Sequence, residues 1–328
     1  MLTLSDRWIW DFWLARDDDE LHAFYLQAPR SLGDPEARHH HATIGHARST
    51  DSSSWQPLPD ALGPGAPGAW DDLATWTGSV LRHDGTWHML YTGIGAAERG
   101  LVQRIGVARS DDLLHWTKHP GNPVLEADPR WYETLEQGRW RDQSWRDPWA
   151  FWDETLGAYR VLVTARARSG PVDGAGVIGA ARTEDFEQFE ALPPLASPGE
   201  FAQMEVPQLV HLDDRVRILF SCLDEDHAAV RRDRLGGSLP GGTYVLSAPD
   251  LDGPFEASTT PLLARDADGT GLYAAKIVEG LGERHVALAF RGWGPLGFAG
   301  ELTDPLPLRQ DARGNWCAGP ARESEDHP

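Results

Sequence analysis

The chain has 328 residues, a length that suits one large β domain or two small ones. Its formal net charge of -20 disfavours nucleic acid and anionic lipid as partners, because both carry negative charge. Two cysteines are too few for a disulfide framework or a cysteine metal site, so we predict no metal and no cofactor.

The N-terminal segment and the hydropathy of the chain indicate its location. Residues 1–16 show no basic start followed by an apolar core, so no secretory signal peptide is predicted there. Apolar runs long enough to cross a bilayer are also missing from the sequence. We therefore expect a cytoplasmic protein without a membrane partner.

One hairpin pattern recurs along the chain. Each copy is an apolar strand, a polar turn and a second apolar strand, rich in aromatic and β-branched residues. In chain order the five predicted hairpins span 8–27, 76–93, 146–165, 205–222 and 273–290. A loop and a third strand with small residues follow each hairpin, and a proline-rich outer segment follows the first four copies.

Regular copies of three or four antiparallel strands predict how the chain folds. Such copies must stack on one another to bury their faces, and radial stacking gives a β-propeller. A β-sandwich would also contain many short strands, but it would not repeat in this way. We predict an all-β, five-bladed propeller over residues 1–320, closed by pairing of the N-terminus with the last blade. A polar tail over 321–328 follows, and no C-terminal β-sandwich is predicted.

Three of the hairpins place a carboxylate at the same point. Counting back ten or eleven residues from the second strand reaches Asp11, Asp147 and Glu205 in the first, third and fourth copies. The same count reaches Thr77 and Tyr273 in the second and fifth copies. If each copy is a blade, these residues begin the innermost strands, which line the central channel. The three acids are therefore predicted to share one end of that channel.

Three carboxylates in one pocket favour a particular chemistry. Their mutual repulsion should raise the pKa of one of them, so that it holds a proton near neutral pH. Glycoside cleavage needs this division, with one carboxylic acid to protonate the leaving oxygen and one carboxylate to attack or to activate water. Taken alone, Asp147 before Pro148 is typical of a turn. The equivalent placement of all three acids favours the catalytic interpretation.

Aromatic and basic residues beside the acids are candidate substrate contacts. Flat indoles stack on the apolar faces of sugars, although a single tryptophan is more typical of a core. Arg146 could neutralise Asp147 or bind a hydroxyl. The triplet His39–His41 is interpreted as a solvated loop rather than a metal site. The candidates from this step are Trp10, Trp13, Trp76, Trp149 and Arg146.

Short motifs resemble two related families of sugar-cleaving enzymes. The stretch 145–152, with its Arg-Asp-Pro triplet, resembles the matching motif of glycoside hydrolase family 32, the invertases and fructanases. Met204-Glu205-Val206-Pro207 is similar to that family's Glu-Cys-Pro motif, with valine in place of cysteine. The stretches 76–80 and 273–276 are similar to its aromatic-Ser-Gly-Ser and Tyr-Ala motifs. The stretch 9–13 looks more like the Trp-Asp pattern of the levansucrases, family 68.

The resemblance implies a five-bladed propeller and a retaining mechanism. By analogy Asp11 is the nucleophile, Glu205 the general acid/base and Asp147 the stabiliser of the transition state. The matching motifs add Thr77, Ser79, Tyr273 and Lys276 to the candidate substrate-binding residues.

The expected activity is that of a glycosidase that cleaves a β-fructofuranoside, such as sucrose or a short fructan, so the partner is a small carbohydrate. The alternatives are an inverting arabinofuranosidase-type hydrolase, a fructosyltransferase, or, in another class, a non-catalytic sugar-binding propeller. A binding protein would need the tryptophans but not the acids, so the presence of all three acids favours an enzyme.

Overall fold

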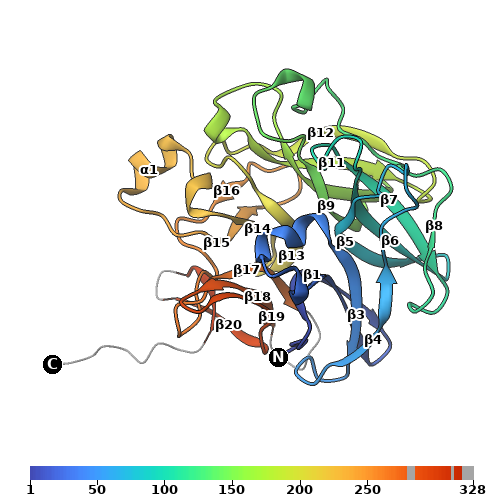
Figure 1. The fold of residues 1–328 in the computed structure, drawn as a ribbon. Coiled ribbons are helices and arrows are strands. Elements are labelled where there is room, and N and C mark those ends of the chain that lie inside the picture. The colour runs from blue at the N-terminus through green and yellow to red at the C-terminus, as the bar shows by residue number, and fades with distance from the viewer. Residues whose placement is uncertain (279–284, 312–313, 320–328) are drawn as a thin grey trace.

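The computed structural model describes residues 1–278, 285–311 and 314–319, and within them five antiparallel sheets surround a central channel (Figure 1). The predicted all-β, five-bladed propeller is confirmed, and the described residues contain no additional β-sandwich. The predicted polar tail, 321–328, lies outside the described residues, as does the turn of the fifth hairpin.

Each blade is one sheet, and in the first four blades the strands pair in their order along the chain. The first two blades are β1(Arg7–Asp17), β2(Glu20–Pro29), β3(Thr43–Ser49) and β4(Gln56–Leu62), then β5(Ala74–His83), β6(Thr86–Ile94), β7(Gln103–Ser110) and β8(Thr117–Lys118). The third and fourth are β9(Trp145–Asp153), β10(Ala158–Arg166), β11(Gly176–Thr183) and β12(Glu190–Ala196), then β13(Glu205–Leu212), β14(Arg215–Cys222), β15(Gly242–Ala248) and β16(Glu256–Ala257). The fifth is β17(Leu272–Val278), β18(Val286–Gly294), β19(Gly297–Leu302), β20(Leu306–Gln310) and β21(Trp316–Ala318). In this fifth blade β18 pairs with both β19 and β20.

Helices are short and lie in the connections between strands. They are α1(Ala229–Leu235) and the 3-10 turns η1(Arg30–Leu32), η2(Pro35–His40), η3(Leu135–Gln137), η4(Val172–Gly174) and η5(Asp224–Asp226). Within the described part of the chain, none of them is long and apolar enough to cross a membrane.

The ring closes through the chain's first residues. β1 contacts β5 of the second blade as well as β17, β18 and β19 of the fifth blade. Leu2 and Leu302 exchange two backbone hydrogen bonds, with N···O distances of 3.2 and 2.9 Å. The predicted pairing of the N-terminus with the last blade is therefore confirmed. This closure fixes the position of β1, the strand that carries Asp11.

The core lies between the blades, where apolar side chains from neighbouring sheets meet. Trp13 and Trp145 are fully buried in it. The Trp13 ring stacks on Phe24, with centroids 6.2 Å apart and an interplanar angle of 18°. Alternation along a strand turns every second side chain toward the same face. Without a local irregularity, Asp11 would therefore be forced into a stack of aromatic rings.

Candidate active site

A β-bulge at the same level of all five innermost strands supplies that irregularity. The register shifts between Trp10 and Phe12, between Trp76 and Gly78, between Glu205 and Gln208, and between Tyr273 and Lys276. In the third blade the shift lies opposite the dipeptide 147–148. A bulge inserts extra residues on one strand and re-aims their side chains. The repeat therefore turns one residue per blade toward the channel.

Two of the bulges contain a proline, which suits the local hydrogen bonding. Pro148 and Pro207 follow Asp147 and Val206, and a bulge is one of the few places in a sheet where a residue without an N–H is tolerated. Asp147 and Val206 themselves have positive φ angles, 58° and 53°. This conformation is uncommon for residues with a side chain, and it bends the backbone of β9 and β13, two of the three strands that carry the acids.

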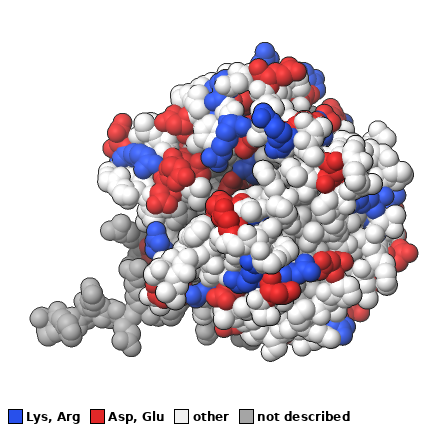
Figure 2. Space-filling model, viewed as in Figure 1, with Lys and Arg blue, Asp and Glu red and all other residues white. Residues whose placement is uncertain are grey.

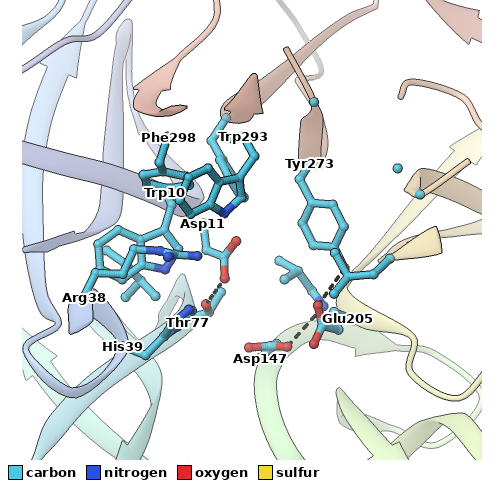
Figure 3. Close-up of a pocket in the computed structure, with 18 of the residues that line it drawn as sticks. Trp10, Asp11, Arg38, His39, Thr77, Asp147, Glu205, Tyr273, Trp293 and Phe298 are labelled. Atoms are coloured by element: carbon cyan, nitrogen blue, oxygen red, sulfur yellow. Dashed lines mark hydrogen bonds between the residues drawn. The ribbon is translucent and has the colours of Figure 1, made fainter. Parts of the chain in front are cut away.

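The three carboxylates predicted to converge line a single cavity of about 670 Å³. Figure 3 shows Asp11 on one side of it, Glu205 across from it and Asp147 below. In the space-filling view the surface is hollowed where acidic and basic side chains gather near its centre (Figure 2). The equivalent positions of the other two blades, Thr77 and Tyr273, line the same cavity.

Within the described part of the chain, the Asp11 side chain makes one hydrogen bond, in which the Thr77 hydroxyl donates to its Oδ2 over 3.1 Å. Burial among protein atoms raises the pKa of Asp11 to about 7, and the negative charges of Asp147 and Glu205 act in the same direction. The Thr77 hydrogen bond opposes this rise because it stabilises the ionised form. Asp11 therefore holds a proton over most of the acidic range.

Asp147 is the most firmly fixed of the three acids. Its Oδ2 accepts hydrogen bonds from the Thr164 hydroxyl at 2.7 Å and from the Val206 backbone N–H at 3.2 Å. Its own N–H donates to the Thr92 hydroxyl at 3.0 Å. Burial raises the pKa of Asp147 even though Arg146 lies close by and lowers it. Three neighbouring strands thus fix this residue, two of them through its carboxylate.

Glu205 is paired with a cation. The Arg146 guanidinium forms an ion pair with its Oε1, and the Tyr273 hydroxyl donates to its Oε2 over 2.7 Å. Burial alone would raise the pKa of Glu205, but the charge of Arg146 and the hydrogen bonds from Tyr273 and Arg146 outweigh burial and lower it. Arg146 also lies 3.5 Å from Asp147, the partner that the sequence suggested for it, and its ion pair with Glu205 was not predicted.

The predicted substrate contacts divide into two groups. Those that line the cavity are Trp10, Trp76, Thr77, Arg146 and Tyr273. Those that do not line it are Trp13, Ser79, Trp149 and Lys276. Trp13 belongs to the core, and the Ser79 hydroxyl accepts a hydrogen bond from the Ala150 N–H between two blades, over 3.3 Å.

Lys276 and Trp149 lie deeper in the channel, at a second, smaller cavity of about 240 Å³. The Lys276 Nζ donates to the carbonyls of Val206 and Pro207 at 2.9 and 3.3 Å and lies 5.2 Å from the centre of the Trp149 ring. Burial lowers the pKa of Lys276 to about 7, against the opposing charges of Asp147 and Asp11. Lys276 therefore supports the Glu205 bulge from behind.

The structure adds cavity-lining residues that sequence reasoning missed. The interpretation of 39–41 as a solvated loop is incomplete, because His39 lies in the turn η2 and lines the cavity. Its carbonyl accepts a hydrogen bond from the Trp76 indole at 2.7 Å. Burial lowers the pKa of His39 to about 4, so it is neutral at physiological pH. Other lining residues without a sequence signal are Arg38, Gln103, Arg141, Trp293 and Phe298.

A comparison with protein-family models identifies the family of this chain. Residues 13–293 match the model of the glycosyl hydrolases family 32 N-terminal domain. The chain belongs to glycoside hydrolase family 32. The match begins two residues after Asp11, so the place of Asp11 in the site comes from the propeller geometry rather than from the match.

Relatives of this family 32 chain include plant enzymes. Beta-fructofuranosidase 1 of Zea mays is 35% identical over 206 residues, which cover 54% of this chain and 28% of the maize protein. A bifunctional fructosyltransferase of Allium cepa is 33% identical over 159 residues, covering 46% of this chain and 23% of that protein. The matches thus span about a quarter of the length of these curated relatives.

Solved structures share the propeller. An inulosucrase from Halalkalicoccus jeotgali bound to kestose superposes with a TM-score of 0.79 at 22% identity, covering 100% of this chain and 94% of that one. A family 32 beta-fructofuranosidase from Bombyx mori superposes with a TM-score of 0.72 at 20% identity, covering 97% of this chain and 64% of the insect protein. At these identities the likeness shows the fold.

Proposed function

We propose that this family 32 protein hydrolyses a β-fructofuranoside, such as sucrose or a short fructan, with retention of configuration. The observation that carries the proposal is the set of three carboxylates, Asp11, Asp147 and Glu205, brought into one cavity by the bulges of three blades. Relatives described as beta-fructofuranosidases supply the substrate class. The three acids supply the chemistry of a double displacement.

In the first step, an oxygen of Asp11 attacks the anomeric carbon of the fructosyl unit, and the bond from that carbon to the leaving oxygen breaks. Glu205, which holds the single proton of the pair in its reactive form, gives that proton to the leaving oxygen, so the leaving sugar departs neutral. Asp11 is then an ester and Glu205 a carboxylate. In the second step, Glu205 takes a proton from water, the water oxygen attacks the anomeric carbon, and the Asp11 carboxylate is released.

The electrostatics of the free site favour the state between the two steps. There the Asp11 side chain is an uncharged ester and Glu205 carries a charge beside Arg146. In the free site, burial already favours a neutral Asp11, and Arg146 already favours an ionised Glu205. The proton of the free pair therefore lies on Asp11 and has to move to Glu205 before the first step, and that step returns the site to the charge distribution that burial and Arg146 favour.

The role of Asp147 in this proposal is to hold sugar hydroxyls. Its Oδ2 is occupied by Thr164 and Val206, which leaves Oδ1 available to a ligand in the cavity. Because both contacts fix the carboxylate, little reorganisation is needed when positive charge develops on the sugar. We propose Trp10, Trp76 and Arg146 as further contacts for the substrate, since all three line the cavity.

Product analysis tests the proposal. Sucrose and a short fructan are incubated with the protein, and NMR follows the anomeric form of fructose before it equilibrates. Retention with equal release of glucose and fructose supports hydrolysis by double displacement. An excess of glucose over free fructose would assign fructosyl transfer instead. An inverted product, or no turnover of either sugar, would overturn the proposal, and matched assays of Asp11→Asn and Glu205→Gln identify contaminating activity.

A further inference from the structure

A row of rings and one guanidinium, here called the aromatic wall, forms one side of the cavity. It consists of Trp10, Arg38, Phe298 and Trp293, all of which line the cavity. The carbon of the Arg38 guanidinium lies 5.6 Å from the centre of the Trp10 ring and 4.3 Å from that of Phe298. The rings of Phe298 and Trp293 are 5.6 Å apart. Figure 3 shows the wall on the Asp11 side of the cavity, facing Glu205 and Tyr273.

The aromatic wall runs from the floor of the cavity to its mouth. Trp10, next to Asp11 on β1, is 2% exposed, Phe298 on β19 is 8% exposed, and Trp293 on β18 is 50% exposed. An apolar ring of this size is usually covered, so the half-exposed indole of Trp293 leaves ring surface that is not packed against the described residues. The outer end of the aromatic wall is therefore the part that can still be covered by a ligand.

A polar group in the same wall also lacks a partner. Arg38 is 8% exposed, and its Nη1 donates to the carbonyl of Pro35 at 2.9 Å and to Glu36 at 3.0 Å. Its buried Nε has no hydrogen-bond partner among the described residues. That atom is enclosed by protein, so the surface that the wall offers to a sugar is the exposed face of its outer ring.

The position of the chemistry decides which sugar unit reaches Trp293. The bond to be cleaved lies between Asp11 and Glu205, so the two sugars of a disaccharide flank these acids on the cavity floor. The half-exposed ring lies at the outer end of the wall. We propose that Trp293 is a specificity-determining residue that stacks on the third sugar of a short fructan. This inference rests on the proposed function and adds to it a subsite used only by chains of three or more units.

A matched pair of variants on one hairpin tests the inference. Trp293, near the end of β18, and Leu296, in the turn before β19, belong to one hairpin. Leu296 is fully exposed and does not line the cavity. The values of kcat/KM for sucrose and for the trisaccharide kestose are measured for wild type, Trp293→Ala, Trp293→Phe and Leu296→Ala. A stacking contact is worth ~0.5–1.5 kcal/mol, which corresponds to roughly a 2- to 12-fold change.

The expected result is a selective loss. Trp293→Ala should lower kcat/KM for kestose by roughly 2- to 12-fold and leave that for sucrose within about twofold. Trp293→Phe should restore most of the loss, because it keeps a flat ring, and Leu296→Ala should match wild type on both sugars. An equal loss on both sugars, or no loss on kestose, overturns the inference but not the proposed function. A wild-type protein that cleaves neither sugar overturns both.

Discussion

The hydrogen bond from Thr77 to Asp11 offers a direct test of the electrostatics of this site. Thr77→Val replaces the hydroxyl with a methyl group of nearly the same size, so the cavity keeps its shape. The variant removes the donor that lies 3.1 Å from Asp11 Oδ2. Because this bond stabilises the ionised form and thereby lowers the pKa of Asp11, its loss must raise that pKa above about 7.

The size of the shift follows from the energy of the bond. A hydrogen bond to a charged group contributes about 1.5–3 kcal/mol, and one pKa unit corresponds to about 1.36 kcal/mol. Water that enters the cavity replaces part of this hydrogen-bond energy, so we expect the pKa of Asp11 to rise by roughly one unit. The active form of the acid pair holds one proton, and in the free site that proton leaves at the higher of the two apparent pKa values. Activity should therefore fall above pH 7 in wild type and above about pH 8 in Thr77→Val.

The assay is the pH profile of kcat/KM on sucrose, which reports the ionisation of the free enzyme. Thr75→Val is the matched control, because Thr75 lies on the same strand and its buried hydroxyl has no hydrogen-bond partner among the described residues. The control should keep the wild-type profile. An alkaline limb in Thr77→Val that stays near pH 7, or that moves to lower pH, would refute the reasoning.

Three further outcomes are expected. Asp11→Asn should lose turnover by roughly 10³-fold or more, and it should melt a few degrees higher at pH 8 but not at pH 4. The raised pKa means that ionised Asp11 destabilises the folded protein, and this penalty grows as the pH rises from 3.8 to about 7. Calorimetry that finds the same increase in melting temperature at both pH values would contradict this account. Glu205→Gln should lose roughly 10²–10⁴-fold on sucrose but far less on a fructoside whose leaving group needs no proton, and equal losses would argue against its role as the acid. Lys276→Met should lower kcat several-fold and leave KM nearly unchanged, because it removes the hydrogen bonds to the two carbonyls of the Glu205 bulge and does not alter the cavity lining. A rise in KM alone would instead indicate that Lys276 contacts the substrate.

The number of blades and the three acids could be predicted from the sequence because both depend on local spacing. A hairpin spans about twenty consecutive residues, and equivalent positions in its copies can be found by counting residues from the second strand. The same counting reached Thr77 and Tyr273, which the structure places beside Asp11 and Glu205 with hydrogen bonds to them. No knowledge of the ring was needed to find these five positions.

The assignment of each neighbouring residue to core or cavity required the tertiary structure. Trp10 lines the cavity while Trp13, three residues further along the same strand, is fully buried in the core. Strand alternation alone does not assign them, because the bulge at Asp11 resets which side chains share a face. Lys276 likewise lies on the far side of its bulge and supports the Glu205 strand instead of lining the cavity.

The sequence by itself determined the repeat, the fold class and the identity of the three acids. Only the tertiary structure decided which of their pKa values are raised and which is lowered, and what surrounds them. The charge of Glu205 depends on Arg146, 59 positions away along the chain, and the aromatic wall joins η2 to the β18–β19 hairpin through Arg38 and Phe298. The physical reason is that pKa values and ligand surfaces are set by groups a few ångströms apart in space, and closing the ring brings together strands that sequence separation keeps far apart.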